Sequence, residues 1–272
     1  MKADRVCSSK EENAFLQKYL DNGSGKILPG AALVGAGCGS YELITLKGLS
    51  EIRRAEVIVY DDLIDEHLLE FAQESCELIY AGKRSGRHSK AQEEINELLV
   101  AKALEGKYIV RLKGGDPYVF GRGGEEALAL KAHGIPVHEV PGVTSSIGLC
   151  GIAGIPVTHR GASRGFHVIT GHTADNLPPE VEEIRWKSYA KLDETFVFLM
   201  GLKSIDMITE KLMRYGKLSD TPVAVIHGEN TDGTYVKLVG TLSDIAAKVK
   251  EVDFPSPAII VVGEVASLEL TD

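Results

Sequence analysis

The sequence lacks the patterns that mark disulfide frameworks, structural zinc sites and membrane-spanning segments. Its four cysteines are scattered without a C-x-x-C pair, so neither disulfides nor zinc are predicted and a reducing compartment fits. No stretch approaches the roughly 20 apolar residues that cross a bilayer, and no apolar signal segment follows the first basic residues. We therefore expect a cytoplasmic protein with no membrane partner.

Positive charge and paired histidines are also scarce. The formal net charge is -9 over 272 residues, which argues against a nucleic-acid partner bound through a broad basic face. The eight histidines include no H-x-x-x-H pair, so no metal is predicted. An anionic ligand must therefore meet a local group of basic residues.

From Ile27 onward, short apolar runs alternate with longer amphipathic ones, which predicts an α/β fold of two domains. Residues 1–26 are rich in charge and form a predicted N-terminal extension with a short helix over 11–20. The first domain is predicted over 27–158 with a largely parallel sheet, and the second over 166–272 with some antiparallel pairing in its later half. Residues 159–165 have no helical period and connect the two. Strands are expected at 31–34, 57–60, 77–80, 108–112, 137–140, 166–170, 195–200, 222–226, 235–239 and 258–262, and helices at 42–55, 92–104, 125–133, 144–153, 204–215 and 242–249.

The first glycine-rich turn, Val34-Gly35-Ala36-Gly37-Cys38-Gly39, follows a predicted strand and precedes a predicted helix. Such a turn can bind a dinucleotide, and Asp61 at the end of the second strand could hold a ribose. However, Ser40 stands where the third glycine of that motif belongs. The glycines can equally serve a tight turn alone, so a nicotinamide-dependent oxidoreductase and a purely structural turn both stay open here.

A loop after the third predicted strand concentrates positive charge in an otherwise acidic chain. Lys83, Arg84, Arg87 and His88 lie there among glycines. A solvated charged loop would explain them. A cradle for carboxylates or phosphates would instead use the planar fork of Arg and the mobile charge of Lys.

The run from Arg111 to Glu126 is the most unusual segment of the chain. It contains five glycines between Gly114 and Gly124 at the end of a predicted buried strand. Ordering glycine is costly in conformational entropy, and a turn needs only one or two glycines. Five glycines therefore indicate that a ligand approaches the backbone. The run also carries Arg111, Lys113 and Arg122. It therefore offers open backbone and positive charge at the sheet edge where α/β proteins bind ligands.

Together these motifs resemble the tetrapyrrole methylase family, and within it the branch that methylates uroporphyrinogen III. The resemblance rests on Gly82-Lys83-Arg84-x-Gly86-x-His88 and on the long run from Arg111 to Glu126, and it covers nearly everything from Leu33 to Leu268. The first loop departs from the family, because Cys38 replaces a proline and Ser40-Tyr41 replace Asp-Pro. The resemblance implies two α/β domains with the cofactor in the interdomain cleft, and a homodimer.

The cofactor implied is S-adenosyl-L-methionine, leaving as S-adenosyl-L-homocysteine, with no metal. Backbone groups at the glycines and side-chain hydroxyls can bind the amino-acid and ribose parts of this cofactor. A methionine can pack against its adenine or sulfur region. From sequence alone, that methionine could instead be an ordinary core residue. Matching positions are Cys38, Gly114, Gly115, Asp116, Val119, Thr144, Ser145, Met200 and Ala224.

The substrate implied carries acetate and propionate arms. One of its pyrrole carbons attacks the sulfonium methyl group in line. Positioning of the two reactants should therefore supply much of the rate enhancement. Asp61 matches the family's acid/base carboxylate, with Asp62 beside it and Lys83 as its partner, and Arg122 completes the catalytic set. An N-cap or loop carboxylate is the alternative interpretation of Asp61. The residues expected to meet substrate carboxylates are Lys83, Arg84, Arg87, Arg111, Lys113, Arg122 and Arg160.

The resemblance thus predicts methylation of uroporphyrinogen III at two ring carbons to give precorrin-2. A methylase of a later precorrin is the nearest rival. From other classes, the nicotinamide-dependent oxidoreductase and a non-catalytic tetrapyrrole-binding protein remain as alternatives.

Overall fold

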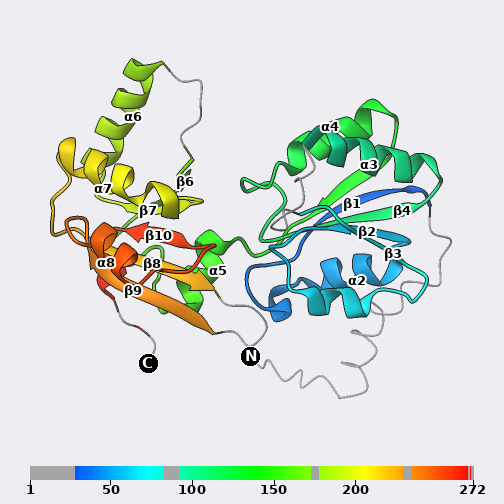
Figure 1. Ribbon diagram of the computed structural model, residues 1–272, viewed down its shortest axis with the longest axis horizontal. Coiled ribbons are helices and arrows are strands. Elements are labelled where there is room, and N and C mark those ends of the chain that lie inside the picture. The colour runs from blue at the N-terminus through cyan, green and yellow to red at the C-terminus, as the bar shows by residue number, and fades with distance from the viewer. Residues whose placement is uncertain (1–27, 83–91, 173–177, 229–233, 269, 271–272) are drawn as a thin grey trace, which may run out of the picture. The chain divides into compact units, whose positions relative to one another are not determined.

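The computed structural model describes residues 28–82, 92–172, 178–228, 234–268 and 270. The chain divides into two compact units, residues 1–144 and 145–272 (Figure 1). Each unit is built on a five-stranded sheet. The early helix expected over 11–20 and the basic loop from Lys83 lie outside the described residues.

Unit 1 contains a fully parallel sheet with the strand order β3-β2-β4-β1-β5. Helices α3 and α4 cover one face and α2 the other (Figure 1). Because both faces are covered, β1 and β2 are nearly continuous apolar runs, as is usual in parallel sheets, whereas β4 also contains the buried Arg111 and Lys113. The elements are β1 Gly30–Gly35, η2 Tyr41–Leu43, α2 Leu46–Arg54, β2 Val57–Tyr60, η3 Glu66–Phe71, β3 Glu77–Tyr80, α3 Gln92–Leu104, β4 Tyr108–Lys113, α4 Gly123–Ala132 and β5 Val137–Val140.

Alternate residues of the strands of unit 1 belong to two separate cores. Leu33 and Val59 pack with α3 and α4, whereas Val34, Ile58 and Val110 pack with α2. The chain therefore leaves β1 toward one face and leaves β4, its neighbour in the sheet, toward the other. Open α/β sheets bind ligands at such a switch in direction, beyond the carboxyl ends of the strands.

Unit 2 contains a mixed sheet with the order β6-β7-β10-β8-β9. Only β6 and β7 are parallel, and the remaining neighbours are antiparallel. A core centred on Phe196 and Phe198 lies beneath α6, α7 and α8, and α5 packs against β7, β8 and β10. The elements are α5 Ser145–Ile152, β6 Phe166–Thr170, α6 Pro179–Lys191, β7 Thr195–Leu199, η4 Leu202–Ser204, α7 Ile205–Arg214, β8 Pro222–Gly228, β9 Tyr235–Thr241, α8 Ile245–Glu251, β10 Ile259–Val262 and η5 Glu264–Ser267.

Most predicted elements are present, including the parallel first sheet and the partly antiparallel second one. The expected helix 42–55 is instead two elements, η2 and α2, because Ser40 and Thr45 each cap a separate start. Three helical segments were not predicted, η3, α6 and η5. Helix α6 buries only Trp186 and Ala190, so its sequence has little apolar period. The contact boundary at Thr144 falls before the predicted linker 159–165, because α5 packs on the sheet of unit 2.

Candidate active site

Two glycine loops meet at the carboxyl edge of the first sheet. Gly37, after β1, and Gly115, after β4, form an antiparallel bridge with N–H to O distances of 3.2 and 2.6 Å. Both have positive φ, 81° and 69°, which glycine adopts without the strain other residues would suffer. The bridge joins the neighbouring ends of β1 and β4, where the chain direction switches.

A third glycine loop, after β5, touches the same point. A Cβ on Gly142 would lie 2.1 Å from the carbonyl oxygen of Gly115, and one on Gly35 would lie 2.5 Å from Gly142. A Cβ on Gly114 would likewise meet Leu63 at 2.5 Å. Backbone from four loops is therefore packed so closely at this edge that side chains are excluded, and main-chain groups are presented in their place.

The carboxylate of Asp116 holds two of these loops in register. Oδ1 accepts a hydrogen bond from the Tyr118 backbone N–H at 2.8 Å, and Oδ2 accepts one from the Gly142 N–H at 3.2 Å. A carboxylate with two backbone donors is well satisfied. The side chain of Asp116 thus shapes the loop, and its backbone is what remains for a ligand. Val119 and Thr144, two other predicted cofactor residues of unit 1, are half-buried, and Cys38 is buried.

Asp61 lies just beyond β2 and forms an ion pair with Arg111 of β4. The distance from Arg111 Nη2 to Asp61 Oδ2 is 2.9 Å, and the Asp61 side chain is 21% exposed. Asp61 Oδ1 also accepts a hydrogen bond from the Leu63 N–H at 3.2 Å. The adjacent Asp62 accepts a hydrogen bond from the hydroxyl of Tyr80. The two neighbouring carboxylates thus have different partners, one a cation and one a phenol.

Arg111 and Lys113 are both buried beneath this edge. Each binds Oε1 of Glu126 in α4, at 3.2 Å from Arg111 Nε and 2.9 Å from Lys113 Nζ. Burial and the charge of Arg111 lower the pKa of Lys113. The sequence predicts that both cations face substrate carboxylates, but the structure places them inside unit 1, paired with the chain's own carboxylates. A buried cation needs such a partner.

Arg122 is the exposed cation of the same run. It adopts φ 57° immediately before α4, and Phe120 adopts φ 53°. Its guanidinium binds Glu125 through two hydrogen bonds of 2.8 and 2.7 Å, and its side chain is half-exposed. Left-handed backbone at non-glycine residues costs free energy and often marks functional sites. Arg122 is therefore available to a ligand, unlike Arg111 and Lys113.

Three predicted cofactor residues belong to unit 2. Met200 follows β7 with φ 56°, and its carbonyl oxygen contacts Nδ1 of His172 at 3.3 Å. Its side chain is partly exposed, whereas Ala224 in β8 is fully buried. Ser145 is half-buried at the start of α5. Met200 is the residue of this group that combines strained backbone with an accessible apolar side chain.

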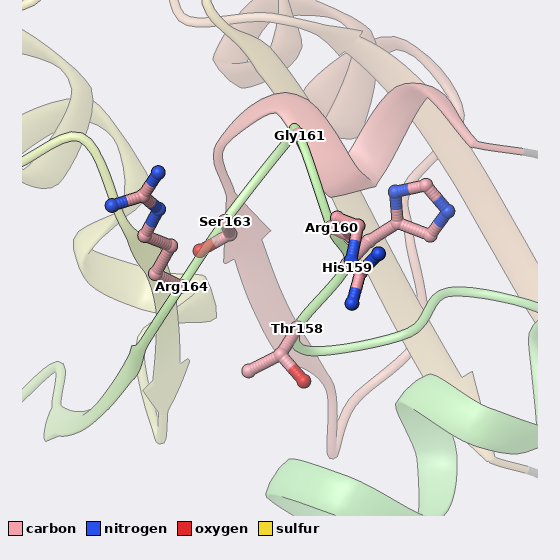
Figure 2. Close-up of a pocket in the computed structure, with 6 residues that line it drawn as sticks. All are labelled: Thr158, His159, Arg160, Gly161, Ser163 and Arg164. Carbon is pink, nitrogen blue, oxygen red and sulfur yellow. The ribbon is translucent and has the colours of Figure 1, made fainter.

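A basic cavity of about 620 Å³ lies in unit 2, in the segment expected to be a linker (Figure 2). A tight turn forms it, in which the backbones of His159 and Ser163 exchange hydrogen bonds of 3.1 and 2.9 Å. Figure 2 shows Arg160 and His159 on one side of this turn and Arg164 on the other. The predicted Arg160 is thus accompanied by a second arginine and a histidine. The lining residues are Thr158, His159, Arg160, Gly161, Ser163 and Arg164.

Comparison with known proteins identifies the arrangement. The family described as Tetrapyrrole (Corrin/Porphyrin) Methylases matches residues 32–246. The chain is 49% identical to the uroporphyrinogen-III C-methyltransferase of Methanocaldococcus jannaschii, over 90% of this chain and 98% of that protein. The chain belongs to the tetrapyrrole methylase family. Its first glycine turn is therefore that of a methylase, and the oxidoreductase alternative loses its support.

Two other relatives of this tetrapyrrole methylase are a solved structure with a bound ligand and a longer protein. The structure of uroporphyrin-III C-methyl transferase from Thermus thermophilus complexed with S-adenyl homocysteine has a TM-score of 0.72 and 36% identity, over 88% of this chain and 93% of that one. The siroheme synthase of Actinobacillus pleuropneumoniae is 42% identical over 96% of this chain, but the match spans only 52% of that longer protein.

The structure brings some of the predicted residues together and leaves others apart. Asp61, Arg111 and Lys113 come together, as do Gly114, Gly115 and Asp116. Arg160 lies in the cavity of unit 2, and Lys83, Arg84 and Arg87 lie outside the described residues. Sequence reasoning missed Glu126, which links the first group, although its position in the first turn of a helix after the glycine run was a signal. It also missed Arg164, which only the turn at 159–163 brings to the cavity.

No metal-binding group of three or more His, Cys, Asp or Glu side chains occurs in the part of the chain that the structure describes. Within the same part, no helix combines the length and apolar character needed to cross a bilayer.

Proposed function

We propose that this tetrapyrrole methylase transfers methyl groups from S-adenosyl-L-methionine to two ring carbons of uroporphyrinogen III, giving precorrin-2 for siroheme or cobalamin synthesis. One observation carries the proposal: the run from Arg111 to Glu126 brings a side-chain-free glycine edge and an ion-paired carboxylate to the same end of one sheet. Relatives named for this reaction match nearly the whole chain.

The glycine edge fits a cofactor with a charged amino-acid part and a ribose. Backbone packed too closely for any Cβ leaves main-chain N–H and C=O groups as the binding groups. S-adenosyl-L-methionine supplies the electrophilic methyl group when it is bound. The residues that would hold it are Gly114, Gly115, Asp116, Val119, Thr144, Ser145 and Met200, with Cys38 and Ala224 shaping the surroundings.

The substrate's carboxylate arms would meet exposed cations. Arg122 and the cavity with Arg160, Arg164 and His159 supply these groups among the described residues. Arginine binds carboxylates through paired hydrogen bonds. Lys83, Arg84 and Arg87 stay predicted partners of the same arms. Arg111 and Lys113 are buried beneath the edge of the sheet. We therefore expect them to act on the site through the side chains that they bind, and not through direct contact with the substrate.

Asp61 is the proposed proton acceptor. Once the new carbon–carbon bond has formed, the ring system must lose a proton, and a carboxylate near the site can take it. Its ion pair with Arg111, at 2.9 Å, holds the carboxylate in place at this edge of the sheet. The pairing of Asp62 with Tyr80 leaves Asp61 as the better candidate.

Incubation of the purified protein with uroporphyrinogen III and methyl-labelled S-adenosyl-L-methionine tests the proposal. Mass spectrometry should show one and then two added methyl groups. The same assay with later precorrins tests the nearest rival. Methylation of those compounds, with no turnover of uroporphyrinogen III, would overturn the proposed substrate. The structural similarity to a cobalt precorrin-4 methyltransferase, at 24% identity, shows only the fold.

A thermal-shift titration tests the cofactor independently. Stabilisation by S-adenosyl-L-homocysteine is expected to rise with the logarithm of ligand concentration above Kd. Stabilisation by NAD or NADP instead would contradict the assignment.

A homodimer located in the cytoplasm completes the proposal. Light scattering coupled to size-exclusion chromatography should give twice the chain mass of 29.4 kDa, and a monomeric mass at assay concentration would remove the dimer from it.

A further inference from the structure

Glu126 is a fully buried carboxylate at the start of α4, close to the proposed active site. Its Oε1 accepts hydrogen bonds from Arg111 Nε at 3.2 Å, Lys113 Nζ at 2.9 Å and Gln92 Nε2 at 3.3 Å. The side chain has no exposed surface. Glu126 is therefore the point at which three donors from α3 and β4 converge.

Arg111 connects Glu126 to Asp61. Its Nε faces Glu126, and its Nη2 faces Asp61 at 2.9 Å. Its Nη1 donates to the carbonyl oxygens of Val59 at 3.2 Å and Leu112 at 3.0 Å. A planar guanidinium held at three corners has one orientation. The position of the Asp61 carboxylate thus depends on a group anchored at the other end by Glu126.

Stability alone explains Glu126 poorly. Its second oxygen, Oε2, is buried and has no hydrogen-bond partner among the described residues. An unsatisfied buried polar atom costs about 1–3 kcal/mol, and a buried ion-pair cluster is often no more stable than an apolar one. Proteins retain such arrangements mainly where a site needs them.

We propose that Glu126 is a positioning residue for the methyl transfer, which acts through Arg111 to fix the carboxylate of Asp61. The inference rests on the proposed role of Asp61. Glu126 itself contacts no reacting atom. It holds the guanidinium in the plane from which Nη2 reaches Asp61.

Other charged groups near Asp61 have separate functions in this arrangement. Lys113 shares Oε1 of Glu126 and balances the second negative charge of the cluster. Asp62, the neighbour of Asp61 in the chain, is bound by Tyr80. Among the described residues, Arg111 alone is hydrogen-bonded to both Glu126 and Asp61, so the effect of Glu126 on the position of Asp61 should require Arg111.

The test is a double-mutant cycle in the full-length protein. Glu126→Gln keeps the shape and removes the charge that anchors Arg111, so kcat should fall about 10- to 100-fold, as misplaced catalytic groups typically cause. The KM for S-adenosyl-L-methionine should stay within about twofold, because the glycine edge is unchanged. In an Asp61→Asn background, Glu126→Gln should reduce kcat no further, because its effect passes through Asp61.

Glu51→Gln is the matched control. Glu51 is also fully buried in unit 1 and ion-paired, but at the opposite end of β4. It should lower stability and leave kcat unchanged. If Glu126→Gln does not fold, Arg111→Lys replaces it, since lysine keeps the charge but cannot bridge two carboxylates, and the same cycle with Asp61→Asn applies.

Several outcomes separate the two hypotheses. An unchanged kcat in Glu126→Gln, or equal fractional losses with and without Asp61, would overturn the positioning role while wild-type turnover upholds the proposed function. Absence of wild-type turnover would overturn the proposed function itself. A kcat loss in Glu51→Gln equal to that in Glu126→Gln would show that the loss reflects general destabilisation.

Discussion

A fully buried glutamate from a helix binds each end of strand β4, Glu51 of α2 at the amino end and Glu126 of α4 at the carboxyl end, and the two differ in how completely their oxygens are hydrogen-bonded. Glu51, near the amino end, is bound by Lys47 at 2.6 Å, by His138 at 3.2 Å and by the Tyr108 hydroxyl at 2.5 Å, with Arg54 at 3.6 Å. Glu126, near the carboxyl end, has hydrogen-bond partners among the described residues at one oxygen only.

The difference indicates at which end of β4 a buried carboxylate serves the stability of the fold and at which end it serves the position of other side chains. At the amino end, both oxygens of the carboxylate have partners, as a structural network requires. At the carboxyl end, where Phe120 and Arg122 have strained backbone, one oxygen has no partner within the described part of the chain. Parallel sheets bind ligands at that second end. Four predictions test or sharpen this comparison.

The largest effect is expected for Asp61→Asn. Asparagine cannot accept the proton, so turnover of uroporphyrinogen III should fall by about 10²–10⁴, while affinity for S-adenosyl-L-homocysteine is retained. Steady-state rates and calorimetric titration measure the two quantities. A loss of both in equal measure would indicate damage to the cofactor site instead.

Glu51→Gln should destabilise the protein by about 3 kcal/mol, because it removes the buried negative charge that the hydrogen bonds from His138, Lys47 and Tyr108 stabilise. Burial alone would raise the pKa of Glu51, but hydrogen bonds from His138, Lys47 and Tyr108 and the charge of Arg54 outweigh it and lower the pKa to about 2. A lowered pKa contributes stability above the unfolded value of about 4.3 and loses it as pH falls toward 2.

Urea unfolding at pH 7 and at pH 3 checks this second prediction. The difference between wild type and Glu51→Gln should be largest at pH 7 and shrink at pH 3. A difference that does not change with pH would show that the charge of Glu51 is not what stabilises the fold.

Tyr108→Phe removes one donor to Glu51 and leaves the others. Burial, followed by the bond to Glu51, raises the pKa of Tyr108, so the hydroxyl stays protonated and donates. Loss of a hydrogen bond to a charged group should cost about 1.5–3 kcal/mol. Chemical denaturation measures it, and a larger loss than in Glu51→Gln would contradict the proposed network.

The smallest effect is expected for Lys47→Met. The Lys47 side chain is 56% exposed, so its ion pair with Glu51 is screened by solvent. Such pairs contribute about 0.2–1 kcal/mol. Added salt should further reduce the difference in stability between the wild type and Lys47→Met. Melting temperatures of both proteins in low and high salt measure this difference.

Much of the fold was predictable because its signals are local. Short β-rich runs between helical and turn-forming segments predicted the positions of β2, β3 and β5 to the residue. Helix α6 was missed because it buries few residues. The contact boundary of the two units falls before α5, because α5 packs on β8. Local pattern cannot tell which sheet a helix covers.

The sequence by itself determined the family, the glycine edge and the identity of the charged residues around it, because these depend on residue type and spacing. Only the tertiary structure decided how the charges are used. Asp61, Arg111 and Glu126 are far apart in the chain and meet because β2 lies beside β4 and α4 returns over the same sheet. That meeting buries Arg111 and Lys113, leaves Arg122 exposed, and so divides the charges of one motif between the interior and the surface of unit 1.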